Sequence, residues 1–553
     1  MTKKYFKKIH EGQLYINSSR KLTSLEFLQN FQIYKLKLIE CSNIVPKLLN
    51  STIKELIIAN CDLKNFNDFQ LDNLEILNVS DNQELYDYSF EDFKQLKQLD
   101  ISSTDRVDIS NLKLQKLKIL NLSYNNISNI TSLQSLVCLE ELDLSFNYDI
   151  DIEPLQHFKQ LKILKLSCCK LSNIQILKLL TNLVELDVFG NYDVGTSSIS
   201  QLVNLKKLNI SETSTHIINF PLLQKLEVLD VSRNININIQ GIKYLVNITN
   251  LNLSQTSVQN IELLQQLIHL KEIDLSRNIS NDFKPLQKMV QLQGLILIGN
   301  NITNIQFLSE LINLQHLNLS QNKNLDISPL QCLVSLTSLN ISECNINEIS
   351  PLKTLVNLID LQLNYNYVKD VLVLKQFKCL KTLQLSGNKE IDITPIQYLT
   401  QLTALTLNGC DLQEISALRP LVNLEYFDIS QNNILFFYPI RDLDLDSEVD
   451  VRDNLIVESS DLFTFFDVED KSQYIQRQPN KYQILLARKM KNIDKTTSLI
   501  RDINIKRKYY ISGKQIVAKT IISLKTKKQN ILVTLVNKTM KLVSQLDEIQ
   551  IYQ

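Results

Sequence analysis

A nine-residue frame, LxxLxLxxN, recurs about every 22 residues through most of this chain. "LEELDLSFN" begins at Leu139, "LKILKLSCC" at Leu161 and "LVELDVFGN" at Leu183. The frame occurs in 21 copies whose first positions run from residue 11 to residue 446, and the ten steps from 226 to 446 are all 22 residues. A fixed period of this length indicates a repeat architecture, in which each copy is stable only when stacked on its neighbours.

Apolar residues alternate at positions four and six of each copy, as Leu142 and Leu144 do. This alternation predicts a very short strand with one buried face, and stacked copies then form a parallel sheet over a continuous leucine core. The residues that follow the frame are apolar at every third place, as at Ile302, Ile305 and Leu308. That spacing predicts a short 3₁₀ or irregular return path instead of a long helix.

Position nine is Asn in twelve copies, and in the other nine it is Cys, Thr or Ser. From Asn147 to Asn278 the Asn copies alternate strictly with Cys or Thr copies. A buried amide can donate to and accept from the backbone of neighbouring turns. We therefore expect this position to hold consecutive turns together, with small residues filling the same place through fewer hydrogen bonds.

Over residues 11–456 the frame resembles the leucine-rich-repeat family, specifically its 22-residue class. That class includes the repeat regulatory subunit of protein phosphatase 1 and the repeats of bacterial internalins. The resemblance implies an α/β solenoid, a curved horseshoe with the parallel sheet on its concave face and short 3₁₀ or irregular convex segments. It also implies that ligands bind the concave face, although no partner-contacting residue can be transferred from the family, because the frame aligns everywhere.

Positions three, five, seven and eight are predicted to face solvent on the concave side. Position five is mostly Asn or Asp and position seven mostly Ser, which predicts polar ladders that keep the sheet surface soluble. Exceptions to this rule are the candidate partner-binding residues, since exposed aromatic and aliphatic side chains are typical of binding hot spots. They are Tyr124, Phe146, Phe189, Ile296, Ile298, His316 and Tyr365.

The stretch "LQGLILIGN" departs furthest from the ladders, because Ile296 and Ile298 replace both ladder residues of one copy. Gly294 and Gly299 flank them and are expected to leave the isoleucines uncovered. For each of these exceptions, drift in a redundant array or local packing between copies is the alternative explanation.

Charge divides the chain into parts. Residues 1–10 form a basic N-terminal segment, 11–456 the solenoid, 457–470 an acidic cap or linker and 471–553 a basic, helical C-terminal region. The last region carries 14 Lys and 4 Arg against four acids, a net charge of 18 − 4 = +14, while the whole chain is neutral. Residues 482–493 read as a helix, and residues 532–549 approximate a coiled-coil pattern. The region is interpreted as a cap, as a segment that docks on the acidic solenoid, or as an attachment to RNA or anionic membrane.

Catalytic and metal-binding motifs are missing from the sequence. The five histidines are scattered singly, no phosphate-binding glycine loop or GxSxG occurs, and the aspartate-rich stretch from 442 lacks the central glycine of a calcium loop. The nine cysteines include no CxxC pair, so they are interpreted as free, mostly buried thiols. We therefore expect no enzyme, no cofactor and no metal.

Location and function follow from the same residues. No signal sequence or membrane span is evident, and six NxS sites on the concave ladders, where glycans would cover the face, favour the cytoplasm, with the nucleus also possible. The predicted function is a non-catalytic scaffold that binds a protein partner on the concave face. The alternatives are a regulatory or targeting subunit of a protein phosphatase and attachment to RNA or anionic membrane through the tail.

Overall fold

The computed structural model describes residues 10–454, except 18–27, 29–30, 42–51, 66–70, 86–89, 91, 106, 111, 193, 217–221, 279–281, 435–439 and 441–447. It also describes the backbone of residues 507–512 and 515–520. The chain divides into two compact units. The first comprises residues 1–411, 416–429 and 442–450, and the second comprises 412–415, 430–441 and 451–553.

A parallel sheet of 21 short strands is the main element of the first unit. The strands are β1 (Gln13–Asn17), β2 (Lys35–Ile39), β3 (Glu55–Ala59), β4 (Ile76–Asn78), β5 (Gln98–Asp100), β6 (Ile119–Asn121), β7 (Glu141–Asp143), β8 (Ile163–Lys165), β9 (Glu185–Asp187), β10 (Lys207–Asn209), β11 (Val228–Asp230), β12 (Asn250–Asn252), β13 (Glu272–Asp274), β14 (Gly294–Ile296), β15 (His316–Asn318), β16 (Ser338–Asn340), β17 (Asp360–Gln362), β18 (Thr382–Gln384), β19 (Ala404–Thr406), β20 (Tyr426–Asp428) and β21 (Glu448–Asp450).

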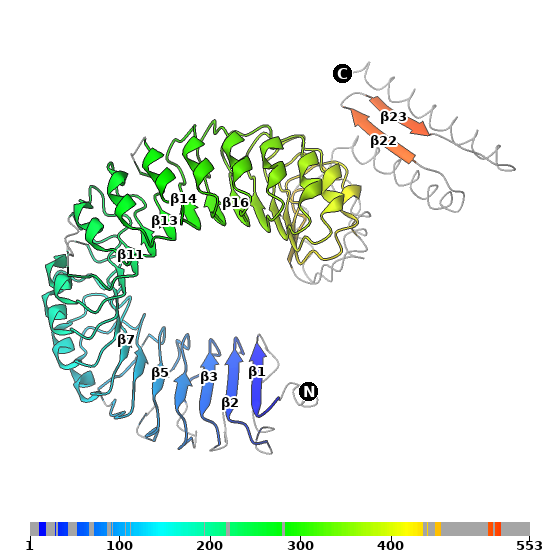
Figure 1. Cartoon of the computed structure of the whole chain (residues 1–553). Helices are drawn as coiled ribbons and strands as arrows, with labels where there is room; N and C mark the ends of the chain where they lie inside the picture. The colour runs from blue at the N-terminus through cyan, green and yellow to red at the C-terminus, as the bar shows by residue number, and fades with distance from the viewer. Residues whose placement is uncertain are drawn as a thin grey trace, which may run out of the picture. The chain divides into compact units, whose positions relative to one another are not determined.

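Each strand pairs with the next strand along the chain without a register shift, so equivalent positions of successive copies lie side by side. Leu142 of β7 lies opposite Leu164 of β8, and Leu164 lies opposite Leu186 of β9. These leucines, and those at position six, are almost completely buried. The strands line the inner, concave side of the first unit (Figure 1), which confirms the predicted leucine-rich-repeat solenoid.

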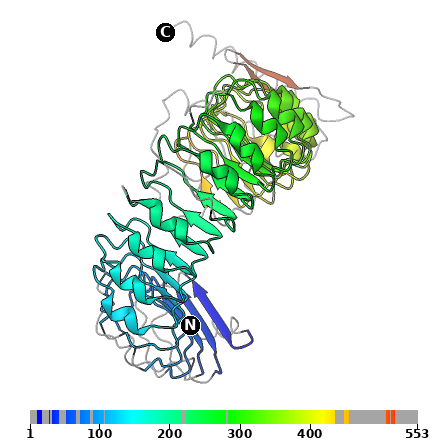
Figure 2. The same cartoon turned by 60° about the vertical axis from the view of Figure 1, so that its left-hand side comes forward.

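Short 3₁₀ segments return the chain on the opposite side of the core, where they follow one another along the unit (Figure 2). They are η2 (Thr131–Ser135), η3 (Glu153–His157), η4 (Gln175–Leu179), η5 (Thr196–Gln201), η6 (Gln240–Tyr244), η7 (Ile261–Gln266), η8 (Lys284–Lys288), η9 (Gln306–Glu310), η10 (Ser328–Cys332), η11 (Ser350–Thr354), η12 (Leu372–Gln376), η13 (Thr394–Tyr398) and η14 (Ser416–Leu418). Many begin just after an Asn or Asp that accepts a backbone hydrogen bond, as Asp151 does from Glu153 at 3.0 Å.

The position-nine asparagines make the predicted ladder. Asn191 is fully buried. Its Oδ1 accepts hydrogen bonds from the backbone N–H of Cys169 and Leu171, at 3.1 and 3.0 Å. Its Nδ2 donates to the carbonyls of Leu166 and Val188, both at 2.8 Å. One amide therefore joins two successive turns through both of its polar atoms.

Cysteine and threonine at position nine make part of this pattern. The thiol of Cys169 donates to the carbonyl of Leu144 at 3.3 Å, and the hydroxyl of Thr213 donates to that of Ile210 at 2.8 Å. Burial raises the pKa of the Cys169 thiol to about 12 and that of Cys344 to about 11. All nine cysteines are free, and the five at position nine are buried.

In the second unit, the backbone N–H of Asn433 donates to the carbonyl of Leu412 at 2.9 Å. An antiparallel pair joins β22 (Arg507–Ser512) to β23 (Gln515–Thr520), with Arg507 opposite Thr520. The helix predicted at 482–493 and the coiled-coil pattern at 532–549 lie outside the described residues. Within the described parts of both units, no helix has the length and hydropathy needed to cross a bilayer.

Candidate binding surface

Where position five is Asn or Asp, its side chain accepts a hydrogen bond from the backbone of position seven and forms a turn at the end of the strand, as in ten copies with Ser and in one with Phe189. The side chain of Asn121 accepts from the backbone N–H of Ser123 at 3.0 Å and from its hydroxyl at 2.8 Å. The prediction that the serine ladder faces solvent is wrong, because Ser123 and Ser145 are buried. The ladder ends the strands through internal hydrogen bonds, and the concave surface is formed mainly by positions three, five and eight.

Position eight takes the left-handed backbone conformation in nearly every described copy. The φ angle is +58° at Tyr124, +60° at Phe146, +54° at Tyr365 and +62° at Gly299. A residue in this conformation directs its side chain along the edge of the sheet toward the next copy. Contacts between neighbouring position-eight side chains follow from this geometry.

Aromatic residues at this edge of β6 to β9 form a cluster that we call the aromatic edge, consisting of Tyr124, Phe146, Tyr148, Phe189 and Tyr192. Tyr124 is exposed and stacks on the half-buried Phe146, with ring centroids 4.1 Å apart and planes 10° from parallel. Phe189 is half-buried two strands further on. The structure therefore brings two of the predicted residues into direct contact and the third into the same edge.

Polar contacts fix the outer members of the aromatic edge. Lys170 places its Nζ 4.9 Å from the centroid of the Tyr148 ring. The hydroxyl of Tyr192 donates to Glu212 at 2.6 Å, and Glu212 also accepts from Arg233 at 3.1 Å. These two bonds lower the pKa of Glu212, and the bond to Glu212 raises the pKa of Tyr192. Tyr148 and Tyr192 directly follow position-nine asparagines, and the sequence already marks them as aromatic exceptions to the ladder rule, although they are not among the seven candidate residues.

Acidic side chains make up much of the concave surface between β5 and β13. They are Asp100, Glu141, Asp143, Glu185, Asp187, Asp230, Glu272 and Asp274. Lys207 pairs with Glu185 at 3.2 Å, and Lys165 lies 3.9 Å from Asp143. Burial raises the pKa of Asp274, and its neighbour Asp230 adds to that effect. Acidic side chains therefore outnumber the basic Lys165 and Lys207 on this part of the sheet.

Ile296 and Ile298 of β14 and the turn after it form a second feature, the isoleucine patch. Both are half-buried, while Leu295 and Leu297 point into the core. The prediction that the flanking glycines leave the isoleucines uncovered is wrong in part. Glu272 leans over Gly294, so that its Cγ would lie 3.1 Å from a Cβ added there.

Gly299 lets a side chain cross the isoleucine copy at the other end of the patch. Arg277 passes this glycine and donates to Gln321, two copies further along, at 3.4 Å. His316 is exposed and lies opposite Gly294 in the strand pairing of β14 with β15. The two isoleucines are thus an apolar centre between Glu272 and His316 on one side and Arg277 and Gln321 on the other.

Tyr365 stands apart from both groups. It is exposed, and its ring lies over Gly387, where a Cβ would come within 2.5 Å of the ring. With strands about 4.8 Å apart, the three inter-strand spacings between β14 and β17 place it roughly 14 Å from the isoleucine patch. The seven predicted residues therefore form three groups on one sheet surface.

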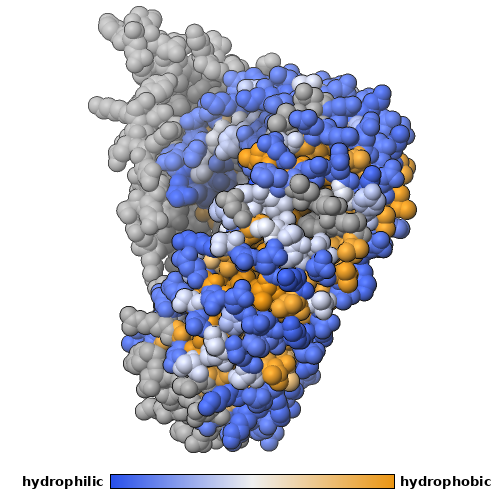
Figure 3. Space-filling view, turned by 90° about the vertical axis from the view of Figure 1, so that its left-hand side faces the viewer, coloured by the Kyte–Doolittle hydropathy of each residue, from blue (hydrophilic) through white to orange (hydrophobic). Residues whose placement is uncertain are grey.

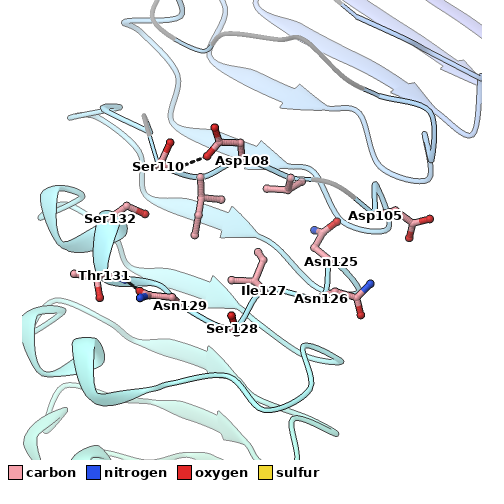
Figure 4. Close-up of a pocket in the computed structure, with 12 residues that line it drawn as sticks. Asp105, Asp108, Ser110, Asn125, Asn126, Ile127, Ser128, Asn129, Thr131 and Ser132 are labelled. Carbon is pink, nitrogen blue, oxygen red and sulfur yellow. Dashed lines mark hydrogen bonds between the residues drawn. The ribbon is translucent and has the colours of Figure 1, made fainter.

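A polar hollow of about 560 Å³ lies beside the loops after β5 and β6 (Figure 4). Asp108 accepts from the backbone N–H of Ser110 at 2.8 Å, and hydrogen bonds from Ser110 lower its pKa. Asp105 lies at the other end of the hollow. No cluster of three or more metal-ligating side chains occurs among the described residues.

Comparisons with known proteins agree with this geometry. The family model of leucine-rich repeats (2 copies) matches residues 115–157. TLR13, in the structure of its complex with ssRNA13, is 21% identical in sequence to this chain. The match covers 80% of this chain and 74% of that chain with a TM-score of 0.54, and it shows similarity of fold alone. The chain is a leucine-rich-repeat protein.

Other solved leucine-rich-repeat proteins are also similar to it. Internalin C2 of Listeria monocytogenes is 32% identical, covering 33% of this chain and 80% of that chain, with a TM-score of 0.31. An internalin of the same organism is 24% identical, covering 65% of this chain and 88% of that chain, with a TM-score of 0.37. No curated protein matches the sequence. The leucine-rich-repeat fold generally mediates protein–protein interaction, and repeat proteins of this kind are typically non-catalytic scaffolds.

Proposed function

We propose that this leucine-rich-repeat protein binds a protein partner on the concave face, with the isoleucine patch as its apolar anchor. The acidic surface of β5 to β13 assists the approach of a basic partner, and the aromatic edge supplies a second contact. Multipoint recognition of this kind suits a rigid sheet, because its side chains lose little freedom on binding.

The composition of the isoleucine patch carries this proposal. Ile296 and Ile298 replace a ladder pair that elsewhere caps the strand, and the core leucines beside them are unchanged. The core positions of this copy therefore do not require isoleucine at these two places. Half-buried aliphatic side chains inside a polar rim are the arrangement that binding hot spots share.

The test is affinity purification with the full chain, comparing the wild type with Ile296→Asp combined with Ile298→Ser. The matched control is Val137→Asp combined with Val422→Ser, which alters two exposed valines outside the patch. A partner recovered with the wild type and the control is expected to bind the isoleucine variant at least about tenfold more weakly in calorimetry. The variant's unfolding midpoint should correspond to a stability within about 1 kcal/mol of the wild type.

Two results would count against this function. Equal binding of the partner to the isoleucine variant would move the site elsewhere on the surface. If no protein is recovered reproducibly with the wild type, the scaffold proposal itself loses its support. Recovery of a phosphatase catalytic subunit would favour the alternative of a phosphatase regulatory subunit.

The proposed cellular location and the proposed attachment through the C-terminal region are tested separately. Cell fractionation checks the cytoplasmic or nuclear location. Salt-dependent binding of the full chain to RNA or anionic vesicles, lost on deletion of residues 471–553, would favour attachment through the tail. The division at residues 10, 456 and 470 is likewise a proposal, which limited proteolysis with mass spectrometry checks.

A further inference from the structure

Six consecutive copies present an exposed β-branched aliphatic residue at the same place, two residues before the first position of the frame. They form the aliphatic stripe, and each is between 46% and 66% exposed: Val246, Ile268, Val290, Ile312, Val334 and Val356. They lie in the turns that precede β12 to β17. Since the strands are stacked in register, the six side chains form one continuous row along the flank of the first unit.

The turn itself does not require an aliphatic residue. Other copies hold Lys159, Thr181, Gln224, Lys378 or Thr400 at this place, and Gln224 and Lys378 directly flank the stripe. The turns are also held firmly together. In two of them Asn313 donates to the carbonyl of Val290 at 2.9 Å and Asn357 donates to that of Val334 at 3.0 Å. Three copies outside the stripe hold an exposed valine at this place (Val137, Val203 and Val422), so the turn accepts aliphatic and polar residues alike, and the stripe is distinguished by its six consecutive aliphatic copies.

We propose that the aliphatic stripe is the contact between two copies of this chain, which pack flank to flank about a two-fold axis. The axis passes between Val290 and Ile312, the centre of the six. Val290 then meets Ile312 of the second copy, Ile268 meets Val334, and Val246 meets Val356. Because the contact is two-fold symmetric, the two residues of each pair lie at equal distances from the axis.

Charges beside the stripe fit the same axis. Lys288 and Glu310 are exposed two residues before Val290 and Ile312, at the ends of η8 and η9. The two-fold axis therefore sets each Lys288 against Glu310 of the second copy, twice in the dimer. On the concave side the neutral Gln293 and Gln315 oppose each other.

Like charges meet only at the ends of the row. Lys243 and Lys353 oppose each other there, one residue further onto the convex side and exposed to solvent. Salt screens such a pair. The centre of the contact is thus complementary and its periphery tolerates the repulsion, which favours self-association over binding of a charged helix or peptide.

The size of the surface suits a symmetric pair. Six half-exposed β-branched side chains offer an apolar patch on the order of 400 Å², the range in which patches on monomers become functional. The polar rows on either side bring each copy toward the roughly 800 Å² per partner of a standard interface. Because β-branched side chains have few rotamers, little entropy is lost when the row is covered.

The experiment is sedimentation equilibrium of the full chain over micromolar concentrations. We expect a dimer for the wild type and for Val137→Asp combined with Val422→Asp, which changes the same place in isolated copies. Ile268→Asp combined with Ile312→Asp should raise the dissociation constant more than about tenfold. A wild type that stays monomeric, or a stripe variant that dimerises as tightly as the wild type, would overturn the proposal.

A charge exchange tests the position of the axis. It also distinguishes this specific contact from non-specific association. Lys288→Glu alone places Glu against Glu310 and should weaken the dimer, as should Glu310→Lys alone. The double variant Lys288→Glu with Glu310→Lys should return to the wild-type dissociation constant. If each single change leaves the constant unaltered, the two copies do not meet about this axis. Circular dichroism of every variant verifies that the solenoid is intact.

Discussion

Cysteines in this chain differ in reactivity because of where the repeat places them. Those at position nine donate to backbone carbonyls inside the turns, as Cys344 does to Leu319 at 3.2 Å. Burial raises the pKa of Cys61 to about 12 and that of Cys410 to about 11, because the thiolate would lose its hydration. Reactivity requires the thiolate, so these side chains act as small core residues.

We predict that thiol-specific reagents separate the nine cysteines into classes. The exposed Cys138, Cys332 and Cys379 should react rapidly in the native protein, and the half-buried Cys168 more slowly. The position-nine cysteines should react only after denaturation, as measured by Ellman titration with mass-spectrometric mapping. Rapid native labelling of any position-nine cysteine would contradict the burial described. Cys332 lies beside the aliphatic stripe, so its rate also reports association of two copies.

The same pKa shifts give a direction for stability against pH. An unfolded thiol loses its proton near its ordinary pKa of 9.0, whereas the buried thiols of Cys169 and Cys344 keep theirs to about 12 and 11. Between these values the unfolded chain binds fewer protons, so stability falls as pH rises. Replacing Cys344 with Ser should reduce this alkaline loss in urea denaturation series.

At the scale of the element, the end of each strand is set by the left-handed residue at position eight. Glycine takes this conformation readily at Gly299 and Gly387, while other copies use residues with a Cβ, such as Glu343 at +57°. A side chain in this conformation costs roughly 1–2 kcal/mol of steric energy. In this conformation the backbone N–H of position eight donates to a carbonyl of the next copy, as Glu343 does to Asn364 at 2.8 Å, and such bonds offset the cost.

Substituting the glycines with alanine should distinguish backbone strain from steric overlap of the added Cβ. Gly299→Ala should destabilise by roughly 1 kcal/mol through the φ of +62° alone, since its nearest new contact is Arg277 Cγ at 3.5 Å. Gly387→Ala should cost more, because Tyr365 lies 2.5 Å from the added Cβ. Gly195→Ala is the control, with open space and no positive φ. Urea midpoints measure the order, and equal effects at all three would refute this account.

The strands and their order could be predicted from the sequence, because Leu142 and its equivalents recur at a constant period. The burial of Ser123 could not be predicted from the sequence, because it depends on how closely the next copy covers that serine. The contact of Arg277 with Gln321 spans 44 residues and exists because Gly299 lacks a side chain. The seven candidate residues could be selected by residue type, but which of them touch depends on the left-handed backbone at position eight and on the side chains that cross from neighbouring copies.

At the scale of the whole molecule, a solenoid is stabilised by contacts between neighbouring copies only. Leu317 of β15 is 2% exposed and lies between Leu295 and Leu339 in the sheet. A repeat array of this kind can lose structure locally while distant copies remain folded. A destabilising substitution is therefore expected to unfold the copies next to it and to have less effect on more distant copies.

Leu317→Asp should open the array around β15, because an unpaired buried charge costs on the order of 3–5 kcal/mol. Hydrogen exchange with mass spectrometry should show lost protection in β14 to β16 and retained protection around β7. Asn318→Asp, on the half-buried side of the same strand, is the control. Uniform loss of protection along the chain would mean that the solenoid unfolds as one cooperative unit.

The position-nine asparagine of one copy accepts hydrogen bonds from the backbone of the copy before it. Between residues 147 and 278, copies with this asparagine alternate with copies that lack it. Asn191 supplies acceptors to the Cys169 turn, which has no amide of its own at position nine. Loss of a single 22-residue copy here would bring two turns without the amide together or two with it, whereas loss of 44 residues preserves the order. Within this region a deletion or duplication of 44 residues therefore keeps every turn that lacks the amide beside an asparagine copy, and it changes the length of the sheet by two strands at a time.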